Sequence, residues 1–277
     1  MNDYKKRLKN QCLFNSLIKH IENYANGSTI FIGQVSQKWI EGFQESLLEN
    51  ELPNGKKLSP ASVATYMKFL RAVFRKALAD GTINRDPTAN VAHIKNVDSD
   101  MVFLSTDEVK RLVAFVPESD YEREIRRAFL FACFTGLRVS DIETLSWGMI
   151  EMNPPQIIKR QQKTQNPVYI PLGKNAQNII FDEKTHDSEK LVFTITQHSR
   201  TASNIALKRW ANEAGITKKI GWHTARRTFA TLTLGSGADA ITVARLLGHT
   251  GLGQVMKYAK ATDEMKRRAV DALPDLI

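Results

Sequence analysis

The side chains best suited to chemistry lie near the carboxyl end, between Gly221 and Tyr258. This stretch offers two imidazoles and one phenol, at His223, His249 and Tyr258, and Arg226 adds a guanidinium three residues after the first imidazole. His223 and Arg226 are three residues apart, so a helix that starts near Trp222 puts both on one face, beside its positive N-terminus. An anion is well placed there. These residue types in this order indicate phosphate chemistry.

Two further cations lie earlier in the chain. Arg138 falls between two expected helices, because Gly136 can end the first in a left-handed turn and Ser140 can cap the second. An arginine that only satisfies helix-end carbonyls is the structural alternative. Lys163 lies at the edge of an expected hairpin turn, where its amine can swing outward, although most lysines in turns only add solubility.

Length and charge set limits on the class of protein. The 277 residues suit two domains, each with its own core. A net charge of +10 points to a polyanionic partner, although a basic protein kept soluble by its lysines has the same balance. Two cysteines, Cys12 and Cys133, indicate a reducing compartment without a disulfide framework. With no apolar signal core or membrane span expected, the predicted location is the cytoplasm, close to the bacterial nucleoid.

Residues 1–98 are predicted to form a small helical domain. Apolar residues recur at helical spacing over 3–24, 36–48 and 60–80, and Ser59-Pro60 is typical of a helix start. Four cations follow the third helix at i, i+3, i+7 and i+8 and could contact DNA or form a solvated face: Lys68, Arg71, Arg75 and Lys76.

Residues 102–277 are predicted to form a second, mixed domain. Helices are expected from Ser105, over 121–134, 174–181 and 199–214, and from Trp222. Between them, 147–152, 157–161 and 168–170 change to strand character and are separated by proline-containing turns. The predicted class is therefore mainly α, with one small three-stranded antiparallel sheet.

Taken in order, six residues resemble the active site of the tyrosine recombinase (phage integrase) family: Arg138, Lys163, His223, Arg226, His249 and Tyr258. The resemblance covers nearly the whole chain. The short motifs that carry it are Thr135-Gly136-Leu137-Arg138 with Asp141, Gln162-Lys163-Thr164, His223-Thr224-Ala225-Arg226 and Leu247-Gly248-His249. Each motif is weak alone, but all of them in this order are specific. The sequences of these motifs are most similar to those of integrases of mobile elements.

The resemblance implies a SAM-like core-binding domain followed by a catalytic recombinase domain, closing together around duplex DNA. It implies site-specific recombination in which Tyr258 cuts DNA to a 3′-phosphotyrosyl link and a free 5′-hydroxyl. Lys163 is then the acid for the 5′-oxygen, and the two arginines stabilise the charge on the phosphate. Four protomers would act on paired sites, with room for accessory DNA-bending proteins, and without ATP, a metal or another cofactor. His20, His93, His186 and His198 show no ligand spacing, in keeping with the absence of a metal site.

Two rival functions share this fold and are separable by experiment. A type IB topoisomerase uses the same chemistry to relax supercoils, and a catalytically silent regulator would only bind DNA. Arg227 is a departure, since many members of the family have histidine directly after the second arginine. The helical domain begins at the start of the sequence, so either a recombinase without an arm-binding domain or a fragment of a longer chain is expected.

Overall fold

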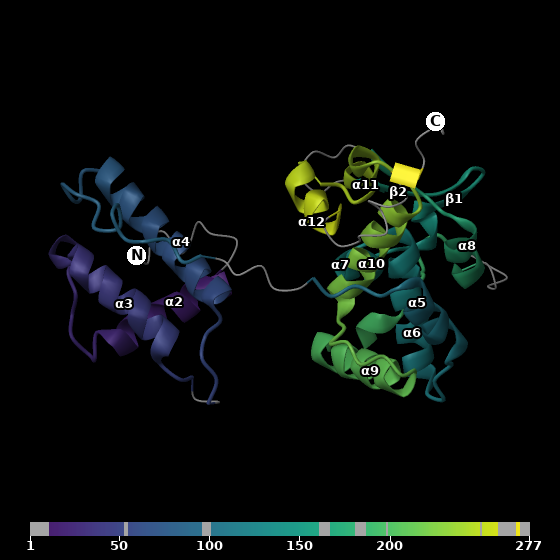
Figure 1. Cartoon of the computed structure of the whole chain (residues 1–277), viewed down its shortest axis with the longest axis horizontal. Helices are drawn as coiled ribbons and strands as arrows, with labels where there is room; N and C mark the ends of the chain where they lie inside the picture. Colours follow the sequence, from purple (N-terminus) through teal and green to yellow (C-terminus); the bar gives the residue numbers. More distant parts are fainter. Residues whose placement is uncertain are drawn as a thin grey trace. The chain divides into compact units, whose positions relative to one another are not determined.

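The computed structural model describes residues 11–52, 55–95, 101–160, 167–180, 187–197, 199–249, 251–259 and 270–271. The chain divides into two compact units, Met1–Ser99 and Asp100–Ile277. Figure 1 shows the helices of each unit and the strands of the second. No helix of the described ranges is long and apolar enough to cross a membrane.

The described residues of the first unit contain the helices α2 (Gln11–Tyr24), α3 (Gln37–Glu49) and α4 (Pro60–Ala79), with a short 3-10 turn η1 (Ile32–Gln34). Serine caps start two of them. The hydroxyl of Ser36 accepts a hydrogen bond from the N–H of Trp39, and that of Ser59 from the N–H of Ser62, both at 3.2 Å. The core is formed by the apolar faces of all three helices, including Leu17, Ile40, Phe43, Met67 and Phe74. The three predicted helices are confirmed over the described residues, and the part of the first one before Gln11 lies outside them.

Arg71 does not belong to the exposed basic stripe that the sequence predicts on α4. Its side chain is buried, and its guanidinium donates hydrogen bonds to the carbonyls of Val91 (2.9 Å) and Ala92 (3.3 Å). Burial is the main cause that lowers the pKa of Arg71. The i, i+3 spacing could not show that the chain after α4 folds back onto this side chain. Lys68, Arg75 and Lys76 are exposed, and Lys76 pairs with Asp80 at 2.5 Å.

The second unit is organised around α6 (Asp120–Thr135), whose side chains are buried along most of its length. Against it pack α5 (Thr106–Ala114), α8 (Lys174–Ile180), α9 (Arg200–Glu213) and α10 (Trp222–Gly235). The described residues also form the helices α7 (Val139–Ile142), α11 (Ala240–Leu246) and α12 (Val255–Ala259), with 3-10 turns η2 (Trp147–Met149), η3 (Ile195–Gln197) and η4 (Leu252–Gln254). The predicted helix starts at Ser105 and Ser199 are confirmed, and the side chain of each serine caps its helix. α10, which carries His223, thus lies directly on the central helix.

The small sheet is antiparallel in the order β1 (Ile150–Met152), β2 (Pro155–Arg160) and β3 (Pro167–Pro171), as the sequence predicts. Its bounds differ from the prediction. Trp147–Met149 forms η2 rather than strand, because the N–H groups of Trp147 and Gly148 donate to the carbonyls of Lys190 and Ser188. These long-range contacts are not visible in local periodicity.

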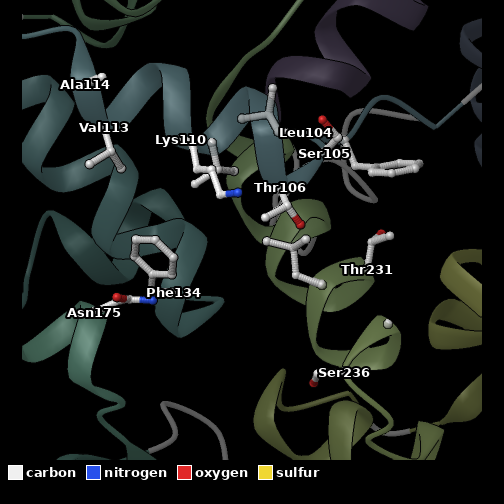
Figure 2. Close-up of a pocket in the computed structure, with 14 residues that line it drawn as sticks. Leu104, Ser105, Thr106, Lys110, Val113, Ala114, Phe134, Asn175, Thr231 and Ser236 are labelled. Atoms are coloured by element: carbon white, nitrogen blue, oxygen red, sulfur yellow. The ribbon is translucent and has the colours of Figure 1, made fainter.

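A cavity of about 740 Å³ lies between α5 and the second half of α10, as Figure 2 shows. It is lined largely by apolar groups, and the hydroxyl of Thr231 is buried in this region without a hydrogen-bond partner in the described part of the chain. Thr231 follows His223 by eight residues, or about 12 Å along the helix axis. The cavity is therefore separate from the cluster of catalytic candidates at the start of α10.

Candidate active site

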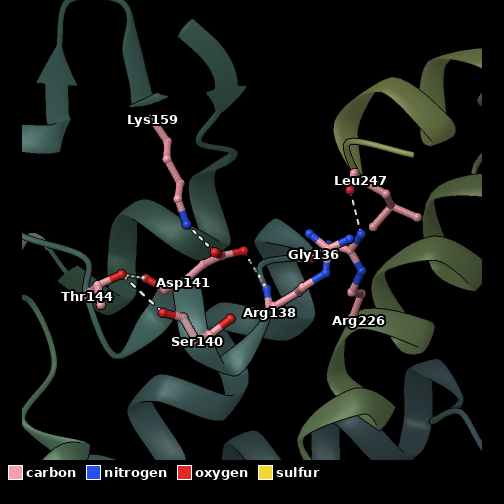
Figure 3. A network of polar contacts seen from close by, with 8 residues as sticks. All are labelled: Gly136, Arg138, Ser140, Asp141, Thr144, Lys159, Arg226 and Leu247. Atoms are coloured by element: carbon pink, nitrogen blue, oxygen red, sulfur yellow. Dashed lines mark hydrogen bonds and ion pairs between the residues drawn. The ribbon is translucent and has the colours of Figure 1, made fainter. Parts of the chain in front are cut away.

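Arg226 joins three separate segments of the second unit (Figure 3). Its guanidinium donates to the carbonyl of Gly136 at 2.6 Å and to the carbonyl of Leu247, and its Nη2 lies 3.0 Å from Nε2 of His249. Only 7% of Arg226 is exposed. One buried cation therefore fixes the elbow before Arg138 and the turn before His249 on the first turns of α10.

The elbow that carries Arg138 depends on Gly136. This glycine has a φ of 70°, and a Cβ added to it would lie 2.5 Å from Cδ1 of Phe229 and 2.9 Å from Cδ2 of Leu247. Both the left-handed backbone and the close approach require glycine. The predicted end of α6 at Gly136 is confirmed.

The start of α7 differs from the prediction. Arg138 itself is the N-cap residue, while Ser140 lies inside the short helix. The backbone N–H of Arg138 donates to the carboxylate of Asp141 at 3.2 Å, so the acidic residue three positions later binds the backbone of the N-cap residue. The side chain of Arg138 is left exposed.

Asp141 also forms an ion pair with Lys159, which lies near the end of β2 (Figure 3). Lys159 was not singled out by the sequence, because nothing local relates a strand residue to a helix start eighteen positions earlier. The pair brings the end of β2 next to the elbow. Lys163 follows four residues later and lies outside the described residues.

His249 is placed by the tight turn after α11. Gly248 has a φ of 62°, and the N–H groups of Gly248 and His249 donate to the carbonyls of Arg245 and Ala244, both at 2.9 Å. The backbone of the turn thus caps the helix, while the imidazole is free to reach Arg226. Its Nδ1 is buried and has no hydrogen-bond partner among the described atoms.

His223 and Tyr258 complete the cluster. His223 is the second residue of α10 and is exposed, in a first turn capped by the hydroxyl of Thr224, which accepts from the N–H of Gly221 at 3.1 Å. Tyr258 lies on α12, partly exposed, and packs against the small core formed by α10, α11 and α12. It is close enough to Arg226 for its phenolate form to raise the pKa of that guanidinium.

The cluster is strongly positive, and this changes its proton affinities. Burial first, and then the charge of Arg138, lowers the pKa of Arg226 to about 10, so its guanidinium stays protonated at neutral pH. Burial and neighbouring arginines also lower the pKa of both His223 and His249 from the ordinary 6.5. At neutral pH the site therefore offers fixed guanidinium charge together with neutral imidazoles that can accept a proton.

Five of the six candidates thus come together: Arg138, His223, Arg226, His249 and Tyr258. This arrangement can hold a phosphate, stabilise added negative charge and present a hydroxyl as nucleophile. Among the described residues, no group of three or more His, Cys, Asp or Glu side chains could hold a metal ion.

Comparison with known proteins shows that both units match models of known protein families. Residues 102–265 match the Phage integrase family, and residues 1–95 match the Phage integrase SAM-like domain. Tyrosine recombinase XerC of Listeria innocua is 29% identical over 223 residues, which are 76% of this chain and 74% of that protein.

Two solved structures have a similar fold. The integrase of the transposon Tn1549, in complex with circular intermediate DNA, gives a TM-score of 0.72 at 16% identity, over 95% of this chain and 94% of that one. A lambda integrase tetramer bound to a Holliday junction gives 0.71 at 20% identity, over 95% and 76%. At these identities the likeness concerns the fold.

Proposed function

Because the chain belongs to the phage integrase family, we propose that it is a site-specific DNA recombinase that cuts and rejoins duplex DNA through a covalent link to Tyr258. The observation that carries the proposal is the buried Arg226, which holds Gly136, Leu247 and His249 in one place. A guanidinium that contacts both neighbouring segments sets the spacing of the cationic cluster. The DNA phosphate is the anion that this cluster is suited to receive.

In the first step, Arg138 and Arg226 bind the nonbridging oxygens of the phosphate. Arg226 uses some of its five N–H donors on backbone carbonyls, which leaves others for the phosphate. Arg138 is exposed and can approach from the elbow. Together the two guanidiniums stabilise the extra negative charge of the pentacoordinate state, the task that metal ions perform in other enzymes of phosphate chemistry.

In the second step, the hydroxyl oxygen of Tyr258 forms a bond to phosphorus while the bond from phosphorus to the 5′-oxygen breaks. The phenol proton passes to a neutral imidazole, and His223 is exposed and suited to accept it because its pKa is lowered. Lys163 gives a proton to the departing 5′-oxygen. Attack of a 5′-hydroxyl on the phosphotyrosine reverses these bonds, so rejoining needs no ATP.

Duplex DNA is the partner that this chemistry requires, and the exposed Lys68, Arg75 and Lys76 of α4 give the first unit cations of its own for the DNA backbone. Exchange between two sites needs four copies of the active site, so we propose a homotetramer on paired sites. The lambda integrase tetramer on a Holliday junction has the same fold. Accessory DNA-bending proteins remain part of this proposal.

The test starts from duplexes that the protein selects from a random-sequence pool. These duplexes are then prepared with a nick, so that the covalent product of cleavage is trapped. A recombinase gives a protein–DNA adduct and, on two site-bearing duplexes, a four-way junction. An adduct with relaxation of supercoils but no junction would favour the type IB topoisomerase. Binding without any adduct would favour the silent regulator.

A further inference from the structure

Asp141 places a negative charge beside a site that has to bind a negative phosphate. Burial and the charge of Arg138 lower the pKa of Arg226, and the carboxylate of Asp141 acts in the opposite direction, so its charge reaches the cationic cluster. The side chain of Asp141 is only 18% exposed, and water therefore screens this charge incompletely. A carboxylate in this position opposes phosphate binding unless another group balances its charge.

Lys159 balances this charge from the strand β2. Its amine forms an ion pair with one oxygen of the Asp141 carboxylate, while the backbone N–H of Arg138 donates to the other oxygen at 3.2 Å (Figure 3). Side chains alternate along a strand, so Lys159 faces the same side of the sheet as Ile157, which is fully buried. The lysine is 26% exposed. The strand itself thus directs this amine toward the elbow.

The guanidinium of Arg138 is a second cation that could pair with Asp141. The two residues are three positions apart at the start of α7, a spacing at which arginine and aspartate form ion pairs on helices. Arg123 and Asp120 have the same spacing at the start of α6 and do form such a pair. Arg138, by contrast, makes no ion pair in the described part of the chain, and its charge acts on Arg226 instead.

Loss of the lysine charge would change the partner of Asp141. A largely buried carboxylate without a partner is unfavourable, and the guanidinium three residues away can approach it with two parallel hydrogen bonds. Arg138 would then be held on Asp141, and the carboxylate and the DNA phosphate would compete for the same guanidinium. The cluster would keep its arginine and lose the use of it.

We propose that Lys159 is a positioning residue for DNA cleavage, which holds Asp141 in an ion pair and so keeps the guanidinium of Arg138 free for the phosphate. The inference rests on the proposed function, because Arg138 has a phosphate to bind only if the chain cleaves DNA. It adds to the site a residue of the small sheet that acts on the phosphate only through Asp141 and Arg138.

The first experiment removes the charge with Lys159→Met, which keeps an unbranched side chain of similar length. Single-turnover cleavage of the selected, nicked duplexes at saturating protein should slow by at least about tenfold, and by no more than the roughly 10²- to 10³-fold that follows loss of one positioned donor. Lys159→Arg keeps a cation opposite Asp141 and should cleave within about threefold of the wild type.

The second experiment removes the competing carboxylate from the slow variant. In Lys159→Met/Asp141→Asn, the asparagine oxygen can still accept from the N–H of Arg138, but it carries no charge to attract the guanidinium. This double variant should cleave faster than Lys159→Met alone by about tenfold or by whatever smaller factor restores the wild-type rate. If the ion pair served only stability, loss of its second member would not restore the rate.

Two further comparisons identify the residue through which Lys159 acts. In an Arg138→Ala background, Lys159→Met should slow cleavage no further, because the group on which it acts is absent. A substrate with sulfur in place of the bridging 5′-oxygen relieves a defect in proton delivery by Lys163, since a thiolate leaves without a proton. Lys159→Met should stay slow on this substrate, because the charge on the phosphate still has to be stabilised.

Lys218→Met is the matched control. It removes a lysine from another partly buried ion pair of the same unit, with Glu108 at 2.6 Å, in which the amine also donates to the carbonyl of Phe103. This variant should lower the melting temperature and leave the cleavage rate unchanged at a temperature where it is folded.

The results that overturn the inference are distinct from failure of the proposed function. The inference is wrong if Lys159→Met cleaves like the wild type, if Asp141→Asn does not restore its rate, if it slows Arg138→Ala further, or if the sulfur substrate rescues it. In each case the wild-type protein still forms its adduct. If the wild-type protein forms no adduct on any selected duplex, the proposed function itself fails, and the inference fails with it.

Discussion

Replacement of Arg226 by lysine separates the two tasks assigned to this residue, because it keeps the charge and removes the fork of donors. The guanidinium reaches the carbonyls of Gly136 and Leu247 at once. A lysine amine is one atom and can satisfy at most one of these acceptors. The other carbonyl then remains buried without a partner.

The expected loss of stability follows from this one unsatisfied carbonyl. One buried polar group left unsatisfied costs about 1–3 kcal/mol of the free energy of unfolding. For a domain of this size, each kcal/mol lowers the melting temperature by roughly 2–4 °C. DNA cleavage should fall further, by about 10²- to 10³-fold, because a positioned donor to the phosphate is lost as well.

Thermal unfolding and the rate of adduct formation are measured on the same samples. Arg227→Lys is the matched control, since Arg227 is the next residue on α10 and makes no ion pair within the described part of the chain. Its unfolding should change by less than about 0.5 kcal/mol. The reasoning is refuted if Arg226→Lys unfolds like the wild type, or if its cleavage recovers fully at a temperature where it is folded.

Three further predictions follow from the site. Lys163→Ala should cleave normal DNA about 10²- to 10⁴-fold more slowly. A substrate with sulfur in place of the bridging 5′-oxygen should restore the cleavage rate of this variant. Equally slow cleavage of both substrates would exclude proton delivery by Lys163. Cleavage should persist in excess chelator, and loss that added Mg²⁺ reverses would contradict this. The free energy of unfolding should fall as pH drops below 6.5, because the folded-state pKa values of His223 and His249 are lowered and the unfolded chain binds more protons. If the slope of this free energy against pH is unchanged after both histidines are replaced by glutamine, the assignment is refuted.

Helix ends were the most predictable part of the fold. Ser36, Ser59 and Ser105 each accept a hydrogen bond from a backbone N–H three residues later, which is a local interaction that the sequence displays directly. Gly136 was predictable for the same reason, since a left-handed turn is set by the residue itself. The order of the catalytic candidates could likewise be read from their motifs.

Features that depend on distant partners could not be predicted. Arg71 has the spacing of an exposed stripe, but its guanidinium is covered by backbone that follows twenty residues later. Lys159 meets Asp141 only because β2 returns to the elbow. Local periodicity contains none of these long-range contacts.

The most direct test of the central claim compares the wild-type protein with Tyr258→Phe on the same selected, nicked duplexes. The substitution removes only the attacking oxygen, so both proteins should bind these duplexes alike. The wild-type protein should form a covalent adduct at the 3′-phosphate, and Tyr258→Phe should form none. An adduct of normal yield from Tyr258→Phe would show that another residue attacks the phosphate and would contradict the account.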